Sequence, residues 1–121
     1  MAERDRGANT FLPLTTPMLH TLLALADGDK HGYAITKEIA RRTDGAVRLA
    51  AGTLYAVIKR AVADGLLAES DDRPDPWLDD ERRRYYRLTA RGRRVAMAEV
   101  DRLEGIVAMA RAKKLLRPRT A

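Results

Sequence analysis

The hydrophobic pattern of this chain changes along its length in an order that few folds can accommodate. Three short helical patterns come first, two strand-like patterns flank a charged loop, and a long helical pattern follows. We expect the first helix over residues 17–26, the second from Tyr33 to about Arg42, and the third from Gly52 to about Asp64. This order predicts a mostly α-helical protein with a small β-hairpin.

The first helix has a recognisable start and an unusually apolar surface. Thr16 is expected as its N-cap, since Pro17 fits the first helical position, where no backbone N–H is needed. Apolar side chains occupy nearly every direction around this helix, which predicts burial on more than one side. In a chain of 121 residues, this favours the chain's own core on one face and a partner chain on the other.

Two strand patterns lie on either side of a loop that contains proline and acidic residues. Residues 66–70 and 83–88 are expected as strands joined by the loop 71–81. The segment 47–49 also alternates and is expected as a strand stub. A hairpin directly after three helices is the arrangement of a winged helix-turn-helix, in which the third helix enters the major groove of DNA.

The last helical pattern is the longest and is expected over residues 90–116, with Thr89 as its N-cap. Its apolar residues recur at steps of four and three over about two heptads, which is typical of a helix that pairs with another helix. We therefore predict a dimer held by this helix and part of the first. The residues expected at the dimer interface are Met18, Leu19, Leu22, Ala96, Val100, Leu103, Ile106, Val107 and Ala110.

Positive charge is concentrated in two segments of the chain, although its net charge is only +6. Residues 82–94 carry seven arginines and no acid, and residues 111–119 carry five basic residues and no acid. Basic segments of this kind commonly contact phosphate backbones. The loop 71–81 is acidic, so its tip is not expected to contact DNA.

The outer face of the third helix is small and basic, as a helix that enters a DNA groove requires. The residues expected to contact DNA are Lys37, Gly52, Thr53, Tyr55, Ala56, Lys59, Arg60, Arg73, Arg82, Arg83 and Arg84. Tyr55 lies between the inner and outer faces, so both core packing and a hydroxyl–phosphate bond are open for it. His31 is expected to cap the second helix rather than to act in catalysis.

Composition excludes several other classes of protein. The chain has no cysteine and two histidines, so we expect no disulfide, no thiolate zinc site and no three-histidine metal site. No catalytic, phosphate-loop or cofactor pattern is present, so neither enzyme activity nor a cofactor is expected. The longest apolar run, of about ten residues, is too short to span a membrane, and no secretory leader is visible. We expect a cytoplasmic protein.

Several short motifs occur together in this chain. They are Leu22-Leu23-Ala24-Leu25, His31-Gly32-Tyr33-Ala34-Ile35, Gly52-Thr53-Leu54-Tyr55, Asp64-Gly65-Leu66-Leu67 and Arg83-Arg84-Tyr85-Tyr86-Arg87-Leu88-Thr89. In this order they resemble the PadR family of transcriptional regulators, from residue 14 to about residue 116. The single C-terminal helix is similar to the short subgroup of that family. The resemblance implies a homodimer that represses transcription at a palindromic operator and is often released by a small effector.

We therefore expect a flexible segment over residues 1–13, a winged helix-turn-helix domain over 14–89, a dimerisation helix over 90–116 and a basic tail over 117–121. The expected partners are double-stranded DNA, a second copy of the chain and a small-molecule effector. The alternative is a winged-helix module that binds proteins, or an effector-sensing adaptor without direct operator binding. The small and basic face of the third helix disfavours a protein-binding module, and an aromatic content of 5% disfavours RNA binding.

Overall fold

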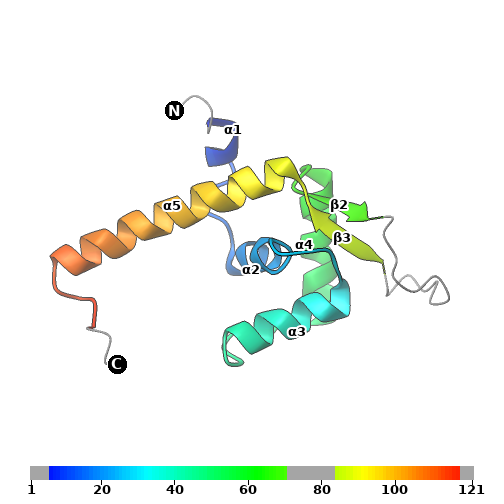
Figure 1. Cartoon of the computed structure of the whole chain (residues 1–121), viewed down its shortest axis with the longest axis horizontal. Coiled ribbons are helices and arrows are strands. Elements are labelled where there is room, and N and C mark those ends of the chain that lie inside the picture. The colour runs from blue at the N-terminus through cyan, green and yellow to red at the C-terminus, as the bar shows by residue number, and fades with distance from the viewer. Residues whose placement is uncertain (1–5, 71–83, 118–121) are drawn as a thin grey trace.

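The computed structural model describes residues 6–70 and 84–117 (Figure 1). Its helices and strands are, in chain order, α1 (Arg6–Asn9), α2 (Thr16–Ala24), β1 (Lys30–His31), α3 (Gly32–Arg42), α4 (Ala51–Ala63), β2 (Leu67–Ser70), β3 (Tyr85–Leu88) and α5 (Ala90–Ala112). The first half of α5 lies over α2 and beside the sheet, and its second half extends away from the other elements (Figure 1). The predicted mostly helical fold with a small sheet is confirmed.

The N-terminal cap of α2 is Thr15 and not Thr16. The side-chain oxygen of Thr15 accepts a hydrogen bond from the N–H of Met18 at 3.2 Å. Pro17 then lies in the first turn, where its missing N–H costs no helical hydrogen bond. Two adjacent threonines offer the same cap chemistry, so only the backbone geometry distinguishes between them.

The predicted cap of α3 is confirmed. The Nδ1 atom of His31 accepts a hydrogen bond from the N–H of Ala34 at 3.1 Å. Ile35 and Ile39, one helical turn apart, are both buried, as are Leu54 and Ile58 on α4. These two stripes face each other in the core, and each buried aliphatic side chain contributes roughly 1.5–3 kcal/mol of hydrophobic stabilisation.

Within the described residues the sheet has three strands, and one of them, β1, is not predicted from the sequence. β3 lies in the centre and pairs antiparallel with β2 on one side and with β1 on the other. In β1, Lys30 lies opposite Tyr86 and His31 lies opposite Tyr85. A strand of two residues shows no alternation that could be detected in the sequence.

The prediction of a strand stub over residues 47–49 is wrong. These residues are irregular, and the N–H of Val47 donates to the side-chain oxygen of Thr43 at 3.0 Å instead of to a neighbouring strand. Val47 and Leu49 still pack against the core. The alternation of the segment therefore reflects burial on one side without strand pairing.

The N-terminal segment predicted to be flexible over 1–13 is anchored in its described part. From Arg6 it forms the single turn α1, which contacts α5, and Ala8 is buried. The carboxylate of Glu99, itself 1% exposed, accepts a hydrogen bond from the N–H of Leu14 at 2.7 Å. A buried carboxylate requires such partners, and this one lies 85 positions away in the chain, so no local pattern predicts it.

The charge of Glu99 is stabilised by a neighbour on its own helix. The guanidinium of Arg102 donates a hydrogen bond to the carboxylate of Glu99. This bond, with the weaker contribution of the Leu14 N–H, lowers the pKa of Glu99 from its usual value against the opposing effect of burial. The anchor of the N-terminal segment is therefore an ionised side chain at neutral pH.

The start of α5 is held by a network around Thr89. As predicted, the Thr89 side chain caps α5 by accepting a hydrogen bond from the N–H of Gly92 at 2.9 Å. The Thr89 hydroxyl also donates to the carbonyl oxygen of Gly65 at 2.6 Å, and the Thr89 N–H donates to the carbonyl oxygen of Leu66 at 3.1 Å. α5 continues to Ala112, four residues short of the predicted end.

Gly92 allows α5 to lie directly against the residues that precede β2. A Cβ atom built at Gly92 would overlap the carbonyl oxygen of Leu66 and would come within 2.7 Å of the side chain of Leu88. One of these neighbours is backbone, which cannot move aside as a flexible side chain can. No larger residue therefore fits at this position without displacing α5.

Gly92→Ala should destabilise the protein, since its methyl group must push α5 away from Leu66. We expect a loss of at least about 2 kcal/mol in the free energy of unfolding, measured by urea denaturation at one protein concentration. Gly105→Ala is the control, because a Cβ there meets nothing within 4 Å and alanine favours a helix by about 1 kcal/mol. Equal unfolding midpoints for the two variants would contradict this explanation.

Candidate nucleic-acid interface

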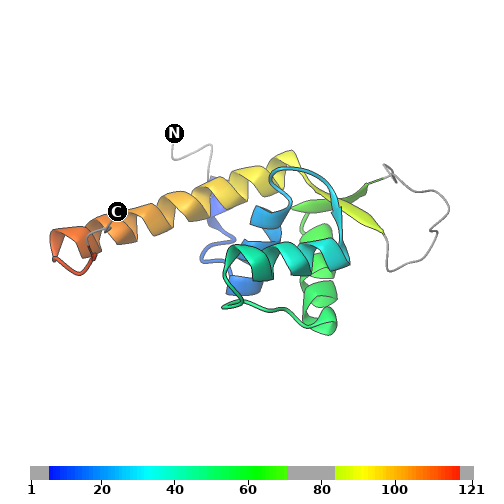
Figure 2. The same ribbon diagram turned by 60° about the horizontal axis from the view of Figure 1, so that its bottom comes forward.

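The outer face of α4 is formed by the residues predicted to form it. Gly52, Thr53, Ala56, Lys59 and Arg60 are exposed, and the residues between them supply the buried stripe. Figure 2 shows α4 at the edge of the helical unit, close to the strands of the hairpin. A surface of small and basic side chains is therefore open along this helix.

The first turn of α4 also has backbone donors without a side-chain cap. The N-cap residue is Ala50, whose side chain cannot accept a hydrogen bond from the amides that follow. The first amides of a helix have no intrahelical partner and carry the positive end of the helix dipole. They lie next to the exposed Gly52 and Thr53, so this end of α4 can accept an anion.

Tyr55 lies against the beginning of α3 and is half-buried. A Cβ atom built at Gly32 would lie only 2.8 Å from the hydroxyl oxygen of Tyr55 and 3.2 Å from Cζ of its ring. The ring therefore packs close to the backbone at Gly32, where an added methyl group would meet the end of the Tyr55 side chain. Of the two roles that the sequence leaves open for Tyr55, the structure has the packing role, and the contact of its hydroxyl with a phosphate stays a prediction.

Lys37 is exposed on α3 and lies beside Tyr33, an aromatic residue absent from the predicted set. The Nζ atom of Lys37 is 5.0 Å from the centre of the Tyr33 ring, and Tyr33 is 64% exposed. The His31 ring stacks on Tyr33 and meets Tyr85 of β3 edge-on, with centroid distances of 6.4 and 5.4 Å. The sequence signals this cluster only through the i, i+4 spacing of Tyr33 and Lys37. Tyr85 is distant in the chain and comes close only because the protein folds.

Arg84 lies at the root of the wing. Its Nε atom is 3.5 Å from a carboxylate oxygen of Glu69, so an ion pair joins the chain before β3 to β2. Arg73, Arg82 and Arg83, which are also predicted to contact DNA, lie outside the described residues, as does the acidic loop 71–81. Arg84 is therefore the one predicted wing contact that the structure places.

Two arginines at the start of α5 are engaged within the chain. A helix start disfavours cations because of the helix dipole. Arg93 donates a hydrogen bond to the carbonyl oxygen of Ala26 at 2.9 Å, just beyond the end of α2, and the guanidinium of Arg91 lies 5.4 Å from the centre of the Phe11 ring. A backbone carbonyl and an aromatic face thus offset part of this charge.

The residues predicted at the dimer interface fall into two groups. Leu22 and Ala96 are buried in the core of the chain. Their assignment to a dimer interface is therefore corrected, because the chain itself already covers their side chains. Met18, Leu19, Leu103 and Ala110 are partly exposed. Val100, Ile106 and Val107 are 41–44% exposed, and Met97 and Met109 are exposed as well.

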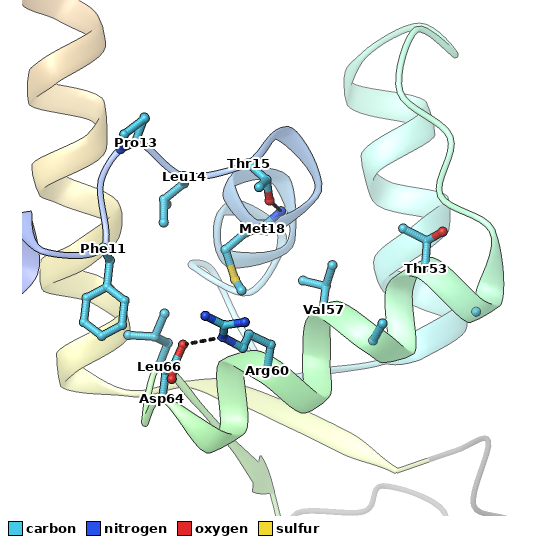
Figure 3. A pocket seen from close by; sticks show the side chains of 12 residues that line it. Phe11, Pro13, Leu14, Thr15, Met18, Thr53, Val57, Arg60, Asp64 and Leu66 are labelled. Atoms are coloured by element: carbon cyan, nitrogen blue, oxygen red, sulfur yellow. Dashed lines mark hydrogen bonds and ion pairs between the residues drawn. The ribbon is translucent and has the colours of Figure 1, made fainter.

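A cavity of about 610 Å³ lies between the N-terminal segment, the start of α2 and the side of α4 (Figure 3). Its apolar walls come from Phe11, Leu14, Met18, Val57 and Leu66, and its remaining lining includes Thr53, Ala56 and Arg60 from the outer face of α4. In Figure 3 the guanidinium of Arg60 extends towards Met18, and its Nε atom donates to Asp64 at 3.2 Å. The sequence does not reveal this cavity, because its walls come from separate segments.

The described part of the chain shows no helix that is long and apolar enough to cross a membrane. It also contains no group of three or more acidic or histidine side chains placed to hold a metal ion. The three helices α2–α4, the small sheet and the basic outer face of α4 define a winged helix-turn-helix protein. The chain belongs to the PadR-like family of transcriptional regulators, whose model matches residues 21–98.

Several proteins with similar sequences or structures are transcriptional regulators. Transcriptional regulator Rv3488 of Mycobacterium tuberculosis is 41% identical over 75 residues, which are 62% of this chain and 64% of that protein. The match thus spans slightly less than two thirds of the relative's length. A PadR family regulator from Clostridium difficile shares the fold, with a TM-score of 0.65 and 22% identity over 81% of this chain and 97% of that one.

A further solved structure is that of BpsR from Bordetella bronchiseptica. Its TM-score is 0.61, and it is 27% identical over 88% of this chain and 70% of that chain. The DNA binding of BpsR is regulated by 6-hydroxynicotinic acid.

Gly32→Ala should destabilise the contact between α3 and α4, because the added methyl group meets the Tyr55 hydroxyl. We expect a cost of about 1–3 kcal/mol in the free energy of unfolding, measured by urea denaturation. Adding Tyr55→Phe to this variant should recover part of the cost by removing the nearest atom. If the cost of Gly32→Ala is the same in the Tyr55→Phe background, the hydroxyl is not the group displaced.

Proposed function

We propose that this chain is a DNA-binding transcriptional repressor that acts as a homodimer at a palindromic operator and is released by a small effector. The observation that carries the proposal is the outer face of α4. Lys59 is exposed there and makes no ion pair within the described residues, and the smaller Thr53 and Ala56 leave room for a close approach. Small and basic side chains on one helix face suit insertion into a major groove.

The groups around α4 would each contact a different part of the DNA. The uncapped amides of its first turn can bind a phosphate. Thr53 lies in that same turn, and Lys59 lies nearly two turns further along the helix. Lys37 on α3 and Arg84 at the wing root are positioned on neighbouring elements for the flanking phosphates. Such contacts fix the register of a protein on the duplex, whereas the face of α4 would read the bases.

The second half of α5 supplies the proposed dimer contact. Val100, Ile106 and Val107 are exposed at a spacing close to a heptad, and this half of the helix extends away from the rest of the chain (Figure 2). Pairing with a second copy would cover these apolar side chains. Two α4 helices in a symmetric dimer would meet successive major grooves about 34 Å apart, which requires a two-fold symmetric operator.

An effector would act by changing the affinity of this dimer for DNA. BpsR provides the precedent, since a small carboxylic acid regulates its DNA binding. An effector that binds better to the free dimer than to the operator complex releases the operator, and the shift is limited by that difference in affinity.

Lys59→Ala and Arg84→Ala should each weaken DNA binding by about five- to tenfold and reduce its salt dependence, because each removes a phosphate or base contact. The DNA is first selected from genomic fragments with the purified wild-type protein, and affinities are then measured by fluorescence anisotropy. The selected fragments should share an inverted repeat.

Arg111→Ala is the matched control for Lys59→Ala, since it removes the same charge from the exposed end of α5. Its DNA affinity should stay within about twofold of the wild type, because a charge far from the duplex acts only through a screened field. If Arg111→Ala weakens binding as much as Lys59→Ala does, net charge and not the face of α4 accounts for the affinity.

Val107→Asp should give a monomer that binds the operator at least about tenfold more weakly, since a charge in an apolar seam is costly to bury. The mass is measured by light scattering during gel filtration. Ala108→Asp places the same acid on an exposed neighbouring position of α5 and should remain dimeric. A fully dimeric Val107→Asp protein would show that the seam lies elsewhere.

A further inference from the structure

Tyr33 is a largely exposed aromatic residue whose ring is nevertheless held in place. Its ring stacks on that of His31 with an angle of 7° between the ring planes, and the Nζ atom of Lys37 lies 5.0 Å from its centre. Its hydroxyl makes no hydrogen bond within the part of the chain that the structure describes. A restrained side chain loses little further entropy when a partner binds, so Tyr33 presents a preorganised donor.

His31 is the fixed support of the Tyr33 ring. Its Nδ1 atom accepts the hydrogen bond from the N–H of Ala34 that caps α3, so its ring cannot rotate without losing the cap. The ring of Tyr85, from the neighbouring strand β3, meets the His31 ring edge-on with a centroid distance of 5.4 Å. The orientation of Tyr33 is therefore determined by a helix cap and by a contact across a strand pair.

These aromatic residues lie between the two parts of the protein that are proposed to contact DNA. On one side, the hydroxyl of Tyr55 from α4 lies 2.8 Å from a Cβ atom built at Gly32, the residue before Tyr33. On the other side, β1 pairs with β3 next to Arg84 at the wing root. In Figure 2 the start of α3 lies next to α4 and close to the hairpin strands. A duplex that contacts both α4 and the wing root would therefore pass the Tyr33 side chain.

The groups that this surface presents suit an anion. Lys37 is exposed and makes no ion pair within the described residues, so its ammonium is available beside the phenol. The adjacent acid, Glu38, has a side chain that is only 13% exposed and is engaged with Lys30 and Arg41. A phosphate oxygen accepts a hydrogen bond from a phenol and is attracted by an ammonium group. The surface therefore offers a donor and a cation to one phosphate, with no free acid beside them.

We propose that Tyr33 and Lys37 form a clamp for one phosphate of the operator, with the Tyr33 hydroxyl as hydrogen-bond donor and the Lys37 ammonium as cation. His31 is the positioning residue that holds the Tyr33 ring. This contact rests on the proposed function, because it lies at the same interface with DNA. A lysine alone supplies a flexible point charge, whereas the phenol adds a directional bond. The clamp therefore fixes the register of α3 on the duplex.

Tyr33→Phe removes only the hydroxyl and keeps the ring that stacks on His31. We expect about five- to tenfold weaker binding to the selected operator fragment with an unchanged salt dependence, because no charge is removed. Lys37→Gln should weaken binding by a similar factor and should reduce the slope of its salt dependence by about one. Affinities are measured by fluorescence anisotropy at several salt concentrations. Wild-type affinity of Tyr33→Phe at every salt concentration would overturn the clamp.

Tyr86→Phe is the matched control, because it removes the hydroxyl of a buried tyrosine on β3. Its DNA affinity should stay within about twofold of the wild type, since a buried hydroxyl is beyond hydrogen-bond distance of the duplex. An equal loss in Tyr86→Phe and Tyr33→Phe would overturn the assignment to Tyr33.

The shared phosphate is located with operator fragments in which single phosphates are replaced by neutral methylphosphonates. One such replacement should reduce the losses caused by Tyr33→Phe and by Lys37→Gln together, because both side chains act on the same group. If the two losses are reduced by replacements at different phosphates, the two side chains do not form a clamp.

His31→Asn tests the positioning role, because asparagine can still cap α3 but has no ring to support Tyr33. It should weaken DNA binding in the wild type and change little when it is added to Tyr33→Ala, since the group that His31 positions is then absent. The urea midpoint of each variant is measured in parallel to check that α3 remains folded. Fully additive losses in the double variant would overturn the positioning role.

The clamp and the proposed interface on α4 can fail separately. If Lys59→Ala weakens binding while Tyr33→Phe and Lys37→Gln do not, the interface on α4 stands and the clamp is overturned. If both clamp variants weaken binding while Lys59→Ala does not, the clamp stands and the placement of DNA on α4 is overturned. If the wild type selects no DNA fragment, both are overturned.

Discussion

The close contact between Gly92 and the carbonyl of Leu66 determines how α5 leaves the winged domain. Thr89 adds to it by capping α5 while it donates to the carbonyl of Gly65, so the turn after α4 and the start of α5 are tied together. Because α5 is held this way, Val95 in its first turns is buried, and its second half extends away from the other elements. The proposed dimer face and the position of α4 relative to it both depend on this contact.

A second constraint links α5 to the cavity. The buried carboxylate of Glu99 holds the N–H of Leu14 and is compensated by Arg102. A buried charge that loses such a partner is strongly destabilising, so the segment from Phe11 to Leu14 is fixed against α5. The same segment forms one wall of the cavity, and α4 forms the opposite wall. The helix proposed to pair the two chains therefore also shapes this cavity.

The elements that the sequence predicts well are those with a strong period and a clear cap. The stripe of Ile35 and Ile39 and the caps His31 and Thr89 are where the pattern indicates. The interface residues that were predicted wrongly follow an apolar pattern that fits two roles, pairing with a second chain and packing in the chain's own core. Leu22 and Ala96 follow the apolar repeat of a pairing helix, yet they are buried in the chain's own core, because periodicity shows which face is apolar and not what covers it.

The sequence by itself determined the order of the elements, the outward face of α4, the caps of α3 and α5 and the basic segments. All of these depend on residues close together in the chain, through helical and strand periods and local hydrogen bonds. Only the tertiary structure decided the strand β1, the bond from Leu14 to Glu99, the fit of Tyr55 over Gly32 and the cavity lined by Arg60. Each of these joins residues from separate elements, and their proximity results from the packing of the whole domain, which no local pattern records.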